Sequence, residues 1–233
     1  MEGKIRGMKL YPLMANLEGR PVLVVGGGTV ATRKVKALLD TGAEIRVVSP
    51  VFTDEIQALI DEKKIKGFQR NFAPSDLEGV SLVFAATDDP ALNESITREA
   101  EARDIPVNDI TNPELCGFFV PSHIRRGDLI LAISTSGKSP ALAKWLRQKL
   151  EEEIGREYEI LTEWMGTIRD YLLAHGYSHE QIRSLSEALL QKELVENLRS
   201  NDKAALSEAL EAAFRSALNH GVPPELTVSL GLP

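Results

Sequence analysis

The stretch Pro21-Val-Leu-Val-Val-Gly26-Gly27-Gly28-Thr29-Val30-Ala31 decides the fold that we expect for this chain. A run of apolar residues ends on Gly26 and a helix-forming segment follows, which predicts a strand, a tight glycine turn and a helix. Gly26 permits the turn, Gly28 lets backbone approach a pyrophosphate, and Ala31 takes the place of a third glycine where helix meets strand. The backbone N–H groups and dipole at this helix start would suit an anionic diphosphate, so the stretch predicts dinucleotide binding.

The residues around this stretch repeat the same strand and helix pattern. We expect further strands over 44–48, 82–86 and 105–110, and helices over 53–64 and 90–103. Strands that alternate with helices form a parallel sheet with helices on both faces. The predicted fold class is therefore α/β: a Rossmann-like parallel-sheet domain, a small α+β segment and a C-terminal helical bundle.

Three parts follow one another along the chain: a dinucleotide-binding domain over 1–112, a middle segment over 113–150 and a helical domain over 151–233. The middle segment holds two apolar runs, 117–121 and 129–133, joined by a polar turn at Gly127, and we expect an amphipathic helix to begin at Pro140.

The last part of the chain is rich in Glu, Leu and Ala, which is typical of helices. Breaks are expected at Gly176 and near Asn201, so several short helices should pack as a bundle. The last dozen residues contain Pro223-Pro224 and Gly231, and we expect them to fray.

Composition favours a cytoplasmic globular protein. The chain has 233 residues, of which 43% are hydrophobic and 26% charged, and a net charge of −7. No apolar run approaches the roughly 20 residues that span a bilayer, and the start lacks the apolar core of a secretion signal, so no membrane partner is expected. The single cysteine, Cys116, excludes internal disulfides, and its apolar neighbours favour a buried thiol over a reactive one.

Positive charge gathers in residues 121–150, which hold six basic residues and one acidic residue. Such a cluster favours an anionic ligand, although each of these side chains could also belong to a solvated surface. The hydroxyl-rich loop 134–140 could bind carboxylates through N–H, hydroxyl and lysine donors, or simply connect a strand to a helix. No aromatic residues are interleaved with the basic ones, so nucleic acid is not an expected partner.

Four motifs together resemble one family. They are Gly26-Gly-Gly-Thr-Val-Ala31 with Arg33-Lys34, Ala85-Ala-Thr-Asp-Asp89, Val107-Asn108 leading into Cys116-Gly-Phe-Phe-Val-Pro-Ser122, and Ala132-Ile-Ser-Thr-Ser-Gly-Lys-Ser-Pro140. The chain is thereby similar to precorrin-2 dehydrogenases, the dehydrogenase/ferrochelatase part of siroheme synthases, in the stand-alone form without a methyltransferase domain.

This resemblance implies NAD-dependent oxidation of precorrin-2, a tetrapyrrole polycarboxylate, to sirohydrochlorin in siroheme biosynthesis. It also implies a homodimer formed through the middle segment. Some family members insert iron as well, which stays open here. The four histidines show no paired metal-ligand spacing, so no metal-binding residues are predicted.

The resemblance also suggests site residues. The cofactor would contact Gly26, Gly28, Thr29, Val30, Pro50 and Val51 by family position, and Thr87 and Asp88 by their place at the end of a predicted strand. Asp88 and Asp89 could instead take part in the turn before Pro90. The end of the second strand carries no acid for a ribose hydroxyl, and only Arg46 as a phosphate partner. The substrate candidates are Asn108, Arg125, Ser134, Ser136 and Lys138.

The catalytic group departs from the family pattern, because Thr111 stands where the family has an aspartate. Asp109 is the nearest carboxylate, and on a continuous strand it would share a face with Thr111 at about 7 Å. We therefore expect Asp109 and Thr111 to be the catalytic residues, with Asp109 as the base, while capping of a turn remains an alternative role for Asp109.

A different class of function is an NAD(H)-sensing regulatory module, in which the helical part mediates assembly. A sensor of this kind would not need the basic segment 121–150.

Overall fold

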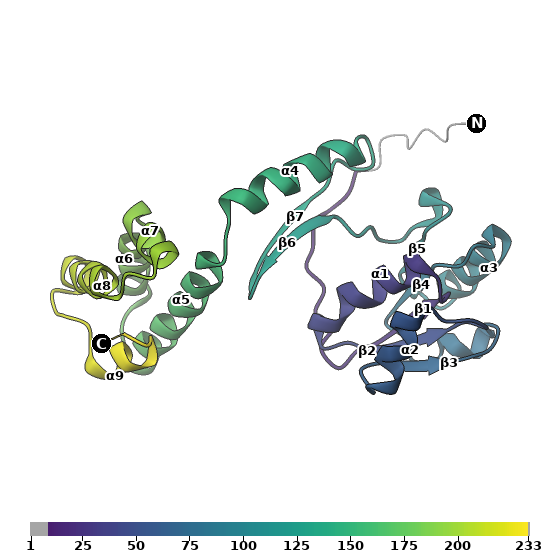
Figure 1. Ribbon diagram of the computed structural model, residues 1–233, viewed down its shortest axis with the longest axis horizontal. Coiled ribbons are helices and arrows are strands. Elements are labelled where there is room, and N and C mark those ends of the chain that lie inside the picture. Colours follow the sequence, from purple (N-terminus) through teal and green to yellow (C-terminus); the bar gives the residue numbers. More distant parts are fainter. Residues whose placement is uncertain (1–8, 233) are drawn as a thin grey trace. The chain divides into compact units, whose positions relative to one another are not determined.

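Five parallel strands form the sheet of the first unit in the computed structural model, which describes residues 9–232 (Figure 1). The sheet order is β3-β2-β1-β4-β5. The strands are β1 (Pro21–Val25), β2 (Glu44–Val48), β3 (Lys66–Phe68), β4 (Leu82–Ala85) and β5 (Val107–Asp109). The chain runs outward from β1 through β2 to β3 and then crosses to β4 on the other side of β1. The topological switch point therefore lies between β1 and β4, and sheets of this kind bind ligands in the crevice above the carboxyl ends of these strands.

Both faces of this sheet are buried. Val22 and Val24 of β1 pack on one face with α1 (Thr29–Leu38) and α2 (Asp54–Asp61). Leu23 and Val25 pack on the other face with α3 (Pro90–Glu101) and the short helix Pro74–Leu77. Because successive strand residues point to opposite faces, the continuous apolar run of β1 serves both cores. The Rossmann-like class predicted from the sequence is confirmed.

The division between compact units falls after Val120, and the second unit begins at Pro121. Its first elements are an antiparallel hairpin of β6 (Ser122–Arg126) and β7 (Leu129–Ile133), followed by α4 (Pro140–Glu153). The apolar run 117–121 does not form a strand, contrary to a simple reading of its hydrophobicity. Phe118 instead packs edge-on against Phe84 of the first unit's sheet, with the ring centroids 5.3 Å apart.

Five helices complete the second unit: α5 (Glu157–Ala174), α6 (His179–Leu189), α7 (Lys192–Ser200), α8 (Lys203–Leu218) and α9 (Pro224–Ser229). The expected breaks at Gly176 and Asn201 are confirmed, since both residues have positive φ just after a helix. The expectation that the C-terminus frays is wrong. Leu226 and Leu230 are buried in the helical core, which holds α9 in place. Whether the middle segment ends near residue 150 stays a prediction.

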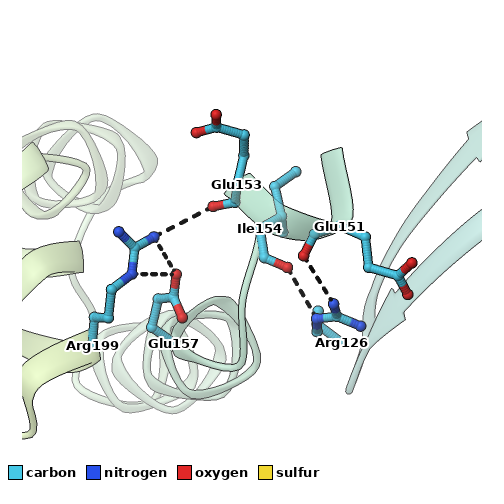
Figure 2. Close-up of polar contacts among 6 residues, drawn as sticks. All are labelled: Arg126, Glu151, Glu153, Ile154, Glu157 and Arg199. Atoms are coloured by element: carbon cyan, nitrogen blue, oxygen red, sulfur yellow. Dashed lines mark hydrogen bonds and ion pairs between the residues drawn. The ribbon is translucent and has the colours of Figure 1, made fainter. Parts of the chain in front are cut away.

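Partly buried polar contacts join the elements of the second unit (Figure 2). Arg126 of the hairpin donates to the carbonyl oxygens of Ile154 and Glu151 at the end of α4. Arg199 of α7 donates to the carboxylate of Glu157, whose exposed fraction is 6%, with its closest N···O distance at 2.6 Å. Two guanidinium groups, that of Arg126 from β6 and that of Arg199 from α7, therefore bind the junction between α4 and α5.

None of the helices within residues 9–232 combines the length and the apolar character needed to cross a bilayer.

Candidate active site

The three glycines after β1 differ sharply in the space around them. Gly26 has φ +120°, and a Cβ there would lie 2.2 Å from the carbonyl oxygen of Ala86. A Cβ on Gly27 would lie 2.0 Å from the carbonyl oxygen of Val51. Gly28 has open space where its Cβ would be, directly before the first turn of α1. Free space in front of unpaired helix N–H groups fits the diphosphate of a dinucleotide.

A cavity of about 470 Å³ lies above the carboxyl ends of β1, β2 and β4. Six of the eight predicted cofactor residues line it: Gly26, Gly28, Pro50, Val51, Thr87 and Asp88. Thr29 and Val30 belong to the first turn of α1 but are not among the lining residues. The sequence reasoning missed further lining residues, namely Val25, Gly27, Val48, Ser49, Phe52, Thr53, Asn71, Phe72, Ala86, Asp89 and Leu92. Asn71 and Phe72 follow β3, where no motif marks them.

Side-chain hydrogen bonds shape the rim of this cavity. The buried Ser49 hydroxyl donates to the carbonyl oxygen of Val51 at 2.7 Å, which turns the chain after β2. The carboxylate of Asp89 accepts from the backbone N–H groups of Ala91 and Leu92 and so caps α3. The predicted turn role therefore belongs to Asp89, while Asp88 faces the cavity.

A chain of polar side chains leads from the cavity to the end of β5. Asn93, which is fully buried on α3, accepts from the Thr87 hydroxyl at 2.7 Å and donates to the Thr111 hydroxyl at 3.4 Å. Sequence reasoning missed Asn93. The available signal was its place, with Thr97, in the buried stripe of α3 that otherwise holds Ile96 and Ala100.

Asp109 ends β5, and the chain turns there instead of continuing as a strand. Its Oδ1 accepts from the backbone N–H of Thr111 at 2.7 Å, from the Thr111 hydroxyl at 2.6 Å and from the backbone N–H of Asn112 at 3.1 Å. The expected spacing of about 7 Å along one strand is thus wrong, because the carboxylate bends the chain back onto itself. The alternative of a turn-capping carboxylate describes this geometry.

The two predicted catalytic residues differ in solvent exposure. Asp109 is only 3% exposed, and its Oδ2 is buried without a hydrogen-bond partner in the described part of the chain. Thr111 is exposed. Thr111 is therefore open to solvent, whereas the carboxylate of Asp109 is not, and the two are joined by the hydrogen bond from the Thr111 hydroxyl.

Asn108 and Cys116 are engaged within the first unit. The Asn108 side chain is buried and donates to the carbonyl oxygen of Phe118 at 3.0 Å, so this predicted substrate residue braces the loop after β5. The Cys116 thiol is half-buried and donates to the carbonyl oxygen of Asp109 at 3.2 Å. Burial raises the pKa of this thiol, which agrees with the expected unreactive cysteine.

The remaining predicted substrate residues lie in the second unit. Arg125 projects from β6 and is exposed. Ser134 and Lys138 are exposed in the loop before α4, and the Ser134 hydroxyl accepts from the backbone N–H of Ser136, which has φ +51°. Arg125 and Lys138 have no carboxylate partner among residues 9–232 that would neutralise them.

Within residues 9–232, no three His, Cys, Asp or Glu side chains gather in a way that could hold a metal ion.

A glycine cradle at the switch point of a doubly wound parallel sheet defines the first unit as a dinucleotide-binding domain of the Rossmann class. Comparison with known proteins agrees, since residues 13–122 match the family "Putative NAD(P)-binding". Residues 126–153 match the family "Sirohaem biosynthesis protein central".

Individual relatives narrow the identification. The chain is 37% identical over 216 residues to a siroheme synthase of Methylobacillus flagellatus and 41% identical over 191 residues to one of Ectopseudomonas mendocina. These matches cover 92% and 82% of this chain but only 46% and 41% of those proteins, so the chain spans less than half of their length. A solved structure described as "SirC, precorrin-2 dehydrogenase" matches with a TM-score of 0.72 and 28% identity, over 88% of this chain and 100% of SirC.

These matches make the chain similar to precorrin-2 dehydrogenases and to the corresponding part of siroheme synthases. The resemblance inferred from the motifs and the predicted NAD cofactor are thereby confirmed.

Proposed function

We propose that this protein is an NAD-dependent dehydrogenase that oxidises precorrin-2 to sirohydrochlorin. The observation that carries the proposal is the match to SirC along the whole of that chain, through both the dinucleotide-binding domain and the part that follows it. Its relatives named siroheme synthase support the same pathway. Iron insertion and a cytoplasmic location stay predictions.

The first unit supplies the cofactor cradle in this proposal. The free N–H groups at the start of α1 would hold the diphosphate, while the residues that follow β2 and β4 line the two sides of the cavity. NAD, when bound, accepts a hydride from a ring carbon of the substrate. Most of the catalysis then depends on positioning, because the protein must hold substrate beside the cofactor.

When the substrate loses a hydride, it must also lose a proton. We propose that Thr111 and Asp109 together accept this proton. The Thr111 hydroxyl donates to Asp109 Oδ1 and accepts from the Asn93 side chain, which leaves one lone pair of its oxygen for a substrate proton. As the oxygen takes that proton, its own proton passes to the carboxylate of Asp109. The buried aspartate thereby replaces, through one hydroxyl, the aspartate that the family has at position 111.

The second unit supplies positive charge for the substrate. Precorrin-2 carries several carboxylates, and Arg125 and Lys138 are exposed cations without acidic partners in the described residues. Ser134 and Ser136 add hydroxyl donors in the same loop as Lys138. We propose that these four residues bind substrate carboxylates.

We also propose that the protein is a homodimer formed through the hairpin and α4. Leu142 and Trp145 support this, because their exposed fractions on α4 are 46% and 55%. Two large apolar side chains exposed three residues apart on one helix favour an interface with a second copy of the chain.

An anaerobic assay with enzymatically generated precorrin-2 and NAD tests the function. We expect sirohydrochlorin and NADH to form in equal amounts. Replacing Arg125 or Lys138 by Ala should raise KM for precorrin-2 about tenfold, because a charge-assisted contact is lost, while the Kd for NAD stays the same. Tight NAD binding with no turnover of precorrin-2 would contradict the proposal and favour an NAD(H) sensor.

A further inference from the structure

Among residues 9–232, no lysine, arginine or histidine lines the cavity. This lining carries two carboxylates, those of Asp88 and Asp89. The end of β2, which in Rossmann folds faces the ribose of the adenosine, carries Ser49-Pro50 and no acid. Arg46, the phosphate partner considered from the sequence, lies in the middle of β2 and does not line the cavity. Within the described part of the chain, neither an acid for the ribose hydroxyl nor a cation for a 2′-phosphate therefore lines this end of the cavity.

One guanidinium does stand next to this end of the cavity. Arg70 follows β3, the neighbour of β2 in the sheet, and directly precedes the lining residues Asn71 and Phe72. Its Nη1 donates to the carbonyl oxygen of Asn71 at 3.0 Å. The preceding residue, Gln69, donates from Nε2 to the carbonyl oxygen of Pro50 at 3.4 Å, so the segment after β3 is tied to the cavity wall.

This guanidinium is already occupied. Arg70 donates to both carboxylate oxygens of Asp76, with N···O distances of 2.8 and 2.5 Å. The Asp76 side chain is 9% exposed and also accepts from the backbone N–H of Ala73 at 2.9 Å, which fixes its position at the start of the helix Pro74–Leu77. The guanidinium of Arg70 lowers the pKa of Asp76, so the carboxylate stays charged at neutral pH. A bidentate ion pair of this kind neutralises the positive charge of Arg70 and occupies N–H donors of its guanidinium.

We propose that the Arg70–Asp76 pair sets the preference for NAD over NADP in this protein. Asp76 withholds the guanidinium that would otherwise bind a 2′-phosphate, and the doubly negative phosphate meets a cavity whose own charges are negative. NAD has a neutral 2′-hydroxyl and needs no such partner. This inference rests on the proposed function only in taking NAD as the cofactor of the site.

Equilibrium binding of NAD and NADP by titration calorimetry on the full chain tests the inference without any turnover. We expect Asp76→Asn to bind NADP at least about tenfold more tightly than the unchanged protein does, because a charge-assisted arginine–phosphate contact becomes available. The Kd for NAD should change less than about twofold, since the 2′-hydroxyl gains no partner of this strength. The double variant Asp76→Asn with Arg70→Gln should lose the gain.

Two further variants make the outcome decisive. Asp61→Asn removes an equal charge from an exposed site of the same unit, where the carboxylate only accepts from Gln57, and should leave both constants unchanged. If Asp76→Asn does not fold, Asp76→Ser keeps an oxygen for the Ala73 N–H and carries the same test. Unchanged NADP affinity in the folded Asp76 variant, or a gain that survives in the double variant, would overturn the inference. Failure of the proposed function would appear separately, as absent precorrin-2 turnover with these nucleotide constants intact.

Discussion

At the scale of single residues, Gly26 and Gly28 are both needed but for different physical reasons. Gly26 has a backbone conformation and a close neighbour that exclude a side chain, whereas Gly28 has an ordinary φ of −86° and open space. The first glycine is therefore required by the backbone conformation, while the second leaves open space in which we propose that the diphosphate lies.

Replacing each of these glycines by alanine should separate the two roles. We expect Gly28→Ala to fold with an unchanged melting temperature and to bind NAD at least about tenfold more weakly, because the new methyl group occupies the space for the diphosphate. Gly26→Ala should lower the free energy of unfolding by about 3 kcal/mol, through strain at positive φ and a clash with Ala86. Thermal melting and nucleotide titration check both. Full NAD affinity in folded Gly28→Ala would show that the diphosphate does not lie there.

The contact between Thr111 and Asp109 leads to a second prediction at this scale. Asp109→Asn keeps an oxygen for Thr111 but cannot take up a proton, so we expect kcat to fall about 100-fold or more, with unchanged Kd for NAD. Thr111→Val should cause a similar loss, and Thr111→Ser should restore most of the activity. Steady-state kinetics across pH separate this from a structural role, because a purely structural loss would leave the pH profile of the residual kcat unchanged.

At the scale of secondary-structure elements, the ion pair between Glu157 and Arg199 joins α5 to α7 (Figure 2). Burial opposes the charge of Glu157, but the hydrogen bonds and charge of Arg199 outweigh burial, so the pKa of Glu157 is lower in the folded protein than in the unfolded chain. A carboxyl with a lowered folded pKa stabilises the fold above its unfolded pKa of about 4.3, and this contribution is lost as the pH falls through the folded value.

The stability of the second unit should therefore fall below about pH 4.3 more steeply in the unchanged protein than in Glu157→Gln. Urea unfolding between pH 7 and pH 3, followed by tryptophan fluorescence, measures this, because both tryptophans lie in the second unit. At pH 7, Arg199→Ala should reduce stability at least about twice as much as Arg183→Ala, whose pair with Glu187 is exposed on both sides. Equal losses would mean that the buried pair contributes no more than a surface one.

At the scale of the whole molecule, the apolar surface of α4 predicts self-association. Trp145→Glu should convert the proposed dimer to a monomer at micromolar concentration, since a charge replaces an aromatic side chain in the interface. Light scattering after size-exclusion chromatography gives the mass directly. Val228→Glu is the matched control, because Val228 is 76% exposed on α9, outside the proposed interface. A dimer that persists in Trp145→Glu would place the interface elsewhere.

Much of this protein could be predicted from the order of its residues. The glycine turn, four of the five strands of the sheet and the helical character of the second half follow from periodicity and from glycine positions, which act over a few residues. The short strand β3 was not predicted. Six of the eight predicted cofactor residues line one cavity, because the ends of parallel strands meet at one edge. The four motifs also identified the family, since their order and spacing are a property of the chain alone.

The tertiary structure decided what depends on contacts between distant residues. It brought Asn93 of α3 to Thr111, paired Arg70 with Asp76 beside the cavity, and buried Leu226 and Leu230 so that α9 forms at the C-terminus. It also turned the chain at Asp109, where a strand had been expected to continue. Local pattern cannot reveal these features, because burial and side-chain hydrogen bonds are determined by which elements pack together, and that is known only once the chain has folded.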